Sequence, residues 1–345
     1  MTTLAIEYFV NSGPRTRLGR IYDTDTDSYM ALGPYGTNSI SSQKGCCAVS
    51  RNGDYIAIAG AATVADNPEV RVVRVSDGVT LHQFNTPAGW VGSLAFNADD
   101  TYLFMLQRNG QVYRMDLASG VAEVVAGSLT NVIGLAVSQF TTGPNVLALY
   151  SVDESILLDA NSFEDLGLQS EERFAFSDTV NALSPGGKYL CVLPAPDLDP
   201  VVYVYSLFEK NLAADLSAVA PIVRDAAFTQ NDRYLLIAAG STGLVVVDTS
   251  TWETETIVEP GVTVSSVCMS PDFTKAYVWT GTGGSQALGV VDVSNWDISY
   301  PVWAENPGSL AVVSMLRAPA GMHPRLNPDA EPFWASLLNT YESVA

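Results

Sequence analysis

The stretch Ser266-Val-Cys-Met-Ser-Pro-Asp-Phe-Thr-Lys-Ala-Tyr-Val-Trp279 decides the fold of this chain. It joins a short apolar strand, which ends before Ser270, to a polar turn that contains Asp272. A second strand follows, and Tyr277 lies near its start. Strand, turn and strand in so short a space predict an antiparallel pair.

The same phrase occurs six times along the chain. If the polar residue after the first strand is taken as a marker, the copies stand at residues 50, 97, 138, 184, 229 and 270, which are 41 to 47 residues apart. A period of about 40–50 residues, with several short strands in each unit, is typical of the blades of a β-propeller. The sequence therefore predicts an all-β fold made of repeated blades.

A second series of repeats falls on the third strand of each unit, which often ends in aspartate. Asp248 and Asp292 are two examples, and Trp252 and Trp296 stand at matched places after the turns that follow them. A carboxylate at the end of a strand can accept hydrogen bonds from the amides of the next turn. We therefore expect these aspartates to fix hairpins.

Incomplete strand patterns flank six complete units, which run from about residue 45 to 305. Three strands are expected at residues 4–10, 16–22 and 28–32, without an inner-strand phrase before them, and residues 310–314 repeat that phrase alone. An open ring would expose sheet edges, so we expect these four strands to share one blade. The prediction is a seven-bladed β-propeller over residues 1–314, closed by three N-terminal strands and one C-terminal strand.

Residues 315–345 are predicted to form a tail with a short amphipathic helix at about residues 329–341. Asp329 suits the cap and Pro332 suits the first turn. One face of this helix would carry the apolar side chains of Phe333, Trp334, Leu337, Leu338 and Tyr341. The helix packs on its own propeller in one interpretation, and docks as an arm on a neighbouring chain in the other.

Three phrases resemble the repeats of a known family. They are Val-Val-Asp-Thr-Ser-Thr-Trp252, Val-Val-Asp-Val-Ser-Asn-Trp296 and the Ser-Pro-Asp phrase that ends at Tyr277, and they are similar to YVTN and WD40-like propeller repeats. The resemblance covers most of the chain and implies a propeller. The chain departs from WD40 repeats because it lacks their Gly-His and Trp-Asp signature, with His82 and His323 as its only histidines. The YVTN-like or quinoprotein-like branch fits better.

Composition narrows the classes of partner. The formal net charge is −20, so an anionic nucleic acid or an anionic membrane surface is not an expected partner of this acidic protein. No run of 18 apolar residues predicts a membrane span, and the first residues lack the features of a signal peptide. The cysteines at residues 46, 47, 191 and 268 are expected to be buried thiols. We expect a cytoplasmic location or a place in a virion.

The sequence contains no motif that predicts a catalytic residue, a cofactor or a metal site, and hence it predicts no enzyme. Asp23-Thr-Asp-Thr-Asp27 resembles the opening of a calcium loop but lacks the bidentate glutamate at its end. The glycine-rich segment 280–285 is not followed by a helix that could complete a phosphate site. The alternative is a lactonase-like hydrolase, in which acidic residues at the channel mouth hold a cation.

Contact residues are expected on the loops that lead into the inner strands. Trp90, Arg224 and Trp303 lie on such loops, and aromatic and arginine side chains often anchor interfaces. Together with the apolar face of the tail helix, they predict a non-catalytic scaffold for protein–protein interaction. The specific hypothesis is a structural subunit of a large assembly, such as the tail or capsid surface of a phage virion. A cell-surface glycan that stacks on Trp90 or Trp303 is the alternative partner.

Overall fold

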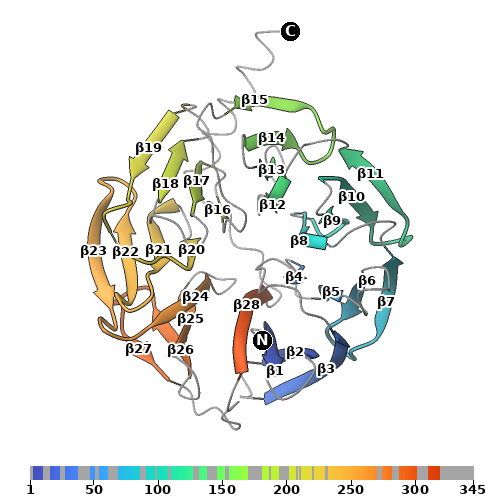
Figure 1. Cartoon of the computed structure of the whole chain (residues 1–345), viewed down its shortest axis with the longest axis horizontal. Helices are drawn as coiled ribbons and strands as arrows, with labels where there is room; N and C mark the ends of the chain where they lie inside the picture. Colours follow the sequence, from blue (N-terminus) through green and yellow to red (C-terminus); the bar gives the residue numbers. More distant parts are fainter. Residues whose placement is uncertain are drawn as a thin grey trace.

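The fold is that of a β-propeller in a computed structural model of the chain (Figure 1). The structure describes residues 3–10, 16–23, 28–37, 47–50, 54–60, 69–85, 91–97, 99–107, 110–126, 132–137, 146–151, 155–169, 181–185, 188–193, 202–206, 209, 211–219, 221–229, 232–269, 274–281, 287–300 and 310–318. All named elements within these ranges are β-strands. The prediction of an all-β propeller is confirmed, whereas the predicted tail helix lies outside the described residues.

The strands form seven four-stranded antiparallel sheets, which we name blades A to G. Blade A contains β28 (Leu310–Ala318), β1 (Thr3–Val10), β2 (Thr16–Asp23) and β3 (Ser28–Thr37). Blade B contains β4 (Cys47–Val49), β5 (Tyr55–Gly60), β6 (Glu69–Arg74) and β7 (Thr80–Asn85). Blade C contains β8 (Val91–Phe96), β9 (Tyr102–Gln107), β10 (Val112–Asp116) and β11 (Ala122–Ala126).

The remaining blades repeat this order from the inner to the outer strand. Blade D contains β12 (Val132–Val137), β13 (Val146–Ser151), β14 (Ser155–Asp159) and β15 (Asp165–Gln169). Blade E contains β16 (Asn181–Leu183), β17 (Tyr189–Val192), β18 (Tyr203–Ser206) and β19 (Asn211–Asp215). Blade F contains β20 (Asp225–Phe228), β21 (Tyr234–Ala238), β22 (Leu244–Asp248) and β23 (Glu253–Val258). Blade G contains β24 (Val264–Met269), β25 (Lys275–Thr280), β26 (Ala287–Asp292) and β27 (Ile298–Ser299).

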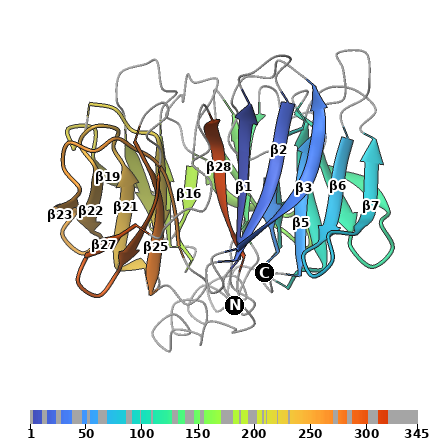
Figure 2. The ribbon, with the colours of Figure 1, turned by 90° about the horizontal axis from the view of Figure 1, so that it is seen from below.

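Blade A joins the two ends of the chain, as the sequence predicts. β28 pairs antiparallel with β1, with Leu310 opposite Val10 and Arg317 opposite Leu4. Figure 2 shows β28 and β1 side by side, seen from the edge of the ring. The strand continues to Ala318, beyond the predicted end at residue 314. Such pairing covers edges that the two segments would otherwise expose.

The marker residue of the repeat phrase closes the turn between the first and second strands. The side chains of Ser50 and Ser184 accept a hydrogen bond from the backbone N–H of the tyrosine five residues later, at 2.9 and 3.0 Å. Asn97 and Thr229 accept the matching bonds at 2.8 and 3.0 Å. The marker side chain therefore satisfies an amide that the turn would leave without a partner, and this explains why a short polar residue recurs there.

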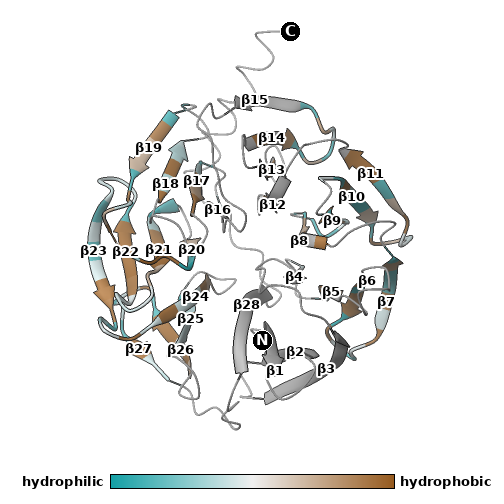
Figure 3. Cartoon of the chain, viewed as in Figure 1, coloured by the Kyte–Doolittle hydropathy of each residue, from teal (hydrophilic) through white to brown (hydrophobic). Residues whose placement is uncertain are grey.

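The hydrophobic cores lie between neighbouring blades. One cluster joins β9 and β10 to β13 across blades C and D, and another joins β17 and β18 to β21 and β22 across blades E and F. Figure 3 shows the hydrophobic colour concentrated on such strands, for example on β22. Because the blades bury their faces against one another, the ring holds together by contacts that repeat from blade to blade.

Candidate functional site

The strand ends form two faces of the propeller. On the loop face, the chain passes from the outer strand of one blade to the inner strand of the next. The turn face carries the hairpins between first and second strands and between third and fourth strands. Of the predicted contact residues, Arg224 lies on the loop face and is exposed. The others, Trp90, Trp303, Phe333, Trp334, Leu337, Leu338 and Tyr341, lie outside the described residues.

On the loop face, blades F and G are in direct contact. Ile222 and Arg224 precede β20, and the Ile222 side chain remains 40% exposed although it lies over Gly240. Gly240 forms an antiparallel bridge with Val264 at the start of β24. Val264 in turn pairs with Thr280 at the end of β25. These contacts connect the end of blade F to the end of blade G on the loop face.

Tyr300 and Glu259 complete this region, and we call Ile222, Arg224, Glu259 and Tyr300 the F–G loop patch. Tyr300 follows β27 and is 43% exposed. Burial of part of the ring raises the pKa of Tyr300, the nearby Glu259 carboxylate raises it further, and a hydrogen bond with Thr280 lowers it. Tyr300 therefore keeps its proton, and the patch presents an isoleucine, an arginine, a carboxylate and a neutral phenol.

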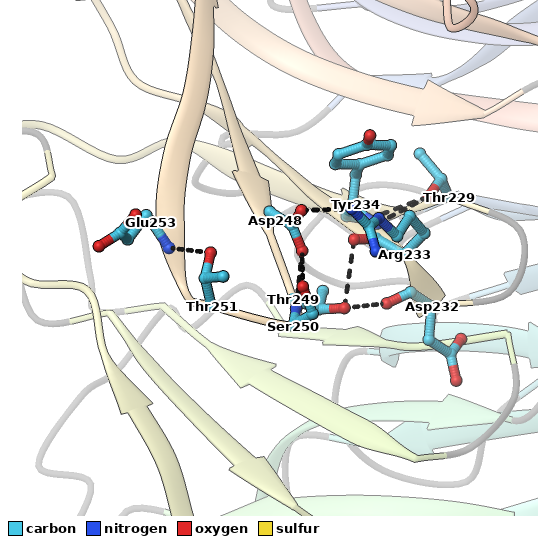
Figure 4. A network of polar contacts seen from close by, with 9 residues as sticks. All are labelled: Thr229, Asp232, Arg233, Tyr234, Asp248, Thr249, Ser250, Thr251 and Glu253. Carbon is cyan, nitrogen blue, oxygen red and sulfur yellow. Dashed lines mark hydrogen bonds and ion pairs between the residues drawn. The ribbon is translucent and has the colours of Figure 1, made fainter.

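The turn face of blade F carries a polar network (Figure 4). Asp248 accepts hydrogen bonds from the backbone N–H and the hydroxyl of Ser250 at 2.8 and 2.6 Å, and Arg233 pairs with its other oxygen at 2.6 Å. The Ser250 donors and the Arg233 charge lower the pKa of Asp248. Thr249 reaches back to the carbonyl of Asp232. These bonds join the hairpin between β22 and β23 to the turn between β20 and β21, which is a structural arrangement.

The same hairpin recurs in other blades and ends at a residue with positive φ. The backbone N–H of Trp252 bonds to the carbonyl of Asp248, and Trp296 bonds to Asp292 in the same way. Their φ angles are 60° and 64°. The Trp252 ring meets Tyr189 of blade E edge-on at 5.0 Å, and the Trp296 ring meets Tyr234 of blade F at 5.2 Å. The tryptophan of each turn therefore packs on the preceding blade.

The described residues contain no cluster that would bind a metal. Within the described strands and turns, histidine, cysteine, aspartate and glutamate do not gather in threes at a place that could hold an ion. Cys191 and Cys268 are buried thiols, and burial raises the pKa of Cys191. No helix in the described part of the chain is long and apolar enough to cross a membrane.

Comparison with known proteins places the chain in a family. Residues 59–304 match the family described as "Cytochrome D1 heme domain". The chain therefore belongs to the cytochrome D1 heme domain family. No curated protein matches the sequence at a significant level.

Solved structures show how common this fold is. In all, 1652 chains of solved structures match, and one of them comes from a crystal structure of the mitotic checkpoint complex. That chain is 17% identical, with a TM-score of 0.63, and the match covers 81% of this chain and 85% of the other. At this identity the likeness shows the fold alone. It confirms the resemblance to propeller repeat proteins.

Family membership corrects one prediction from the sequence. We expected that the protein is not an enzyme, and this is wrong because the matched family is named for the heme domain of a cytochrome, a group that carries redox chemistry. Hydrolase motifs and contiguous ligand patterns, which this sequence lacks, are local in sequence. A prosthetic group can be held by scattered contacts and one or two axial side chains, so it leaves no such motif.

The described histidine and three of the buried sulfur side chains do not fit the role of heme ligands. Side chains that ligate heme iron are histidine, cysteine, methionine and tyrosine. The only described histidine, His82, lies on outer strand β7 with its Nε2 2.7 Å from the carbonyl oxygen of Leu117. Cys191, Met105 and Met115 are fully buried inside the cores between blades. Burial or an existing contact therefore keeps these four side chains from ligating a heme.

Proposed function

We propose that this propeller acts as a protein-binding scaffold whose contact surface is the F–G loop patch. One observation supports it above the others: Ile222 and Tyr300 are 40% and 43% exposed on the same face as the exposed Arg224. Aliphatic, aromatic and arginine side chains together are typical of the centre of an interface. The net charge of −20 favours a partner with a basic surface.

The solved chain in the mitotic checkpoint complex gives secondary support, since it is a propeller from a protein complex. For the present chain, the specific form of the proposal is a structural subunit of a larger assembly. A phage virion is the particle that we would examine first. The experiment below also tests that form, because the abundant partners would be virion proteins.

The test compares matched variants of the full chain. Tagged wild type, the double variant Ile222→Asp with Tyr300→Asp, and Val121→Asp are purified from the native source, and bound proteins are quantified by mass spectrometry. Val121 is the control, because it is 65% exposed but lies beside β11, away from the patch. A stoichiometric partner should be bound by wild type and Val121→Asp and lost from the double variant.

A purified complex of that partner and the wild type is then measured by light scattering, with the melting temperature of each variant as the check on folding. The proposal fails if the wild type is monomeric and binds no protein in stoichiometric amount. It also fails if the folded double variant binds the partner as well as the wild type does.

A further inference from the structure

His82 connects two blades. It lies on β7, the outer strand of blade B, whereas Leu117 and Gly120 belong to the hairpin between β10 and β11 of blade C. The Nε2 atom lies 2.7 Å from the carbonyl oxygen of Leu117. A Cβ atom placed on Gly120 would be 2.4 Å from the Nδ1 atom of His82. The imidazole therefore fills the space beside a residue that has no side chain.

Gly120 is the counterpart of the tryptophans of blades F and G. Its backbone N–H bonds to the carbonyl of Asp116 at 2.8 Å, as that of Trp252 does to Asp248, and its φ is 72°. In blade F the turn sends its own ring onto the preceding blade. In blade C the preceding blade sends a ring onto the turn. The His82 ring thus takes the place that the tryptophan ring of the turn takes in blades F and G.

The contacts of the two ring nitrogens decide what His82 can bind. A carbonyl oxygen can only accept, so at 2.7 Å Nε2 must carry the proton and donate it to Leu117. In a neutral imidazole with that proton on Nε2, the lone pair lies on Nδ1, which faces Gly120 at a distance too short for even one added methyl carbon. An iron ligand needs a free lone pair and room for the porphyrin plane beyond it.

We infer that His82 stabilises the contact between blades B and C and is not a heme ligand in this member of the cytochrome D1 heme domain family. The inference is independent of the proposed scaffold function, because it concerns the turn face and not the F–G loop patch. It also assigns a structural role to His82, one of the two histidines of the chain.

The test uses the full chain as wild type, His82→Ala and His82→Gln, with two measurements on each. Thermal unfolding measures how much His82 stabilises the contact between the blades. Titration with hemin, followed through its absorbance, measures ligation. His82→Ala should lower the melting temperature by about 1–2 °C, the shift for roughly 1 kcal/mol in a chain of 345 residues. His82→Gln keeps an N–H donor and should lower it less. Hemin titrations of all three should agree within about twofold.

Two results would overturn the inference. One is a loss of hemin affinity of about tenfold or more in folded His82→Gln, restored by added imidazole. The other is an unchanged melting temperature in His82→Ala, which would show that His82 does not stabilise the contact between blades B and C. A wild type that shows no saturable hemin binding supports the first half of the inference, and the melting temperatures then decide the second half.

Discussion

Blades C and F solve the same packing problem from opposite sides. Each has a hairpin that ends at a residue with positive φ, Gly120 in one and Trp252 in the other. Trp252 reaches its neighbour with its own ring, whereas Gly120 makes room for the His82 ring of its neighbour. In both cases a ring fills the space between the turn and the neighbouring blade. The difference is which of the two blades supplies that ring.

The largest effect is expected from removal of the Trp252 ring. Trp252→Ala should lower the free energy of unfolding by about 2–3 kcal/mol, below the value for a fully buried ring because Trp252 is only half-buried. The backbone at φ 60° disfavours any residue with a Cβ. Trp252→Gly should therefore be less harmful than Trp252→Ala. Urea unfolding of the two variants measures both differences, and equal values would show that backbone strain at this turn is negligible.

The blade C arrangement should give a smaller effect with a distinctive coupling. Gly120→Ala adds a Cβ at φ 72° and 2.4 Å from His82, so it should cost about 1–2 kcal/mol. When His82 is also replaced by alanine, the added carbon has room. The double variant should therefore be more stable than the sum of the single effects predicts, by about 1 kcal/mol. Strict additivity in the double-mutant cycle would show that the two residues do not share one space.

These two turns also show how far the sequence could be interpreted. The markers Ser50, Asn97, Ser184 and Thr229 predict the propeller because each makes the same local bond, and local bonds repeat as sequence patterns. The pairing of β28 with β1 followed from counting strands. The contact of His82 with blade C could not be predicted, because its partner is 35 residues away and is a backbone carbonyl with no sequence signal.

The predicted contact residues show the same limit. Arg224 was predicted on a loop that leads into an inner strand, and it is exposed there. Glu259 and Tyr300 were missed, since they come together only when blades F and G pack side by side. A signal for Glu259 exists in the sequence, because it precedes Pro260 and Gly261, a pair that marks a turn.

The smallest effect concerns the carboxylates that the two turns have in common. Serine donors lower the pKa of Asp116 in blade C and of Asp248 in blade F. A nearby arginine charge lowers both further, from Arg114 at Asp116 and from Arg233 at Asp248. A lowered pKa in the folded state stabilises the protein above the ordinary pKa of aspartate, about 3.9. That contribution is lost as the pH falls through the lowered pKa.

Melting curves from pH 7 down to about pH 3 therefore test whether the two turns are alike in this respect. Asp116→Asn and Asp248→Asn should each be slightly less stable than wild type at pH 7. Each should also lose less stability on acidification, since the amide does not titrate. Asp248→Asn should show the larger change, because it also removes the pairing with Arg233, and this difference should shrink in high salt. Parallel melting curves for both variants and wild type would mean that these carboxylates shape the turns without contributing to stability through their charge.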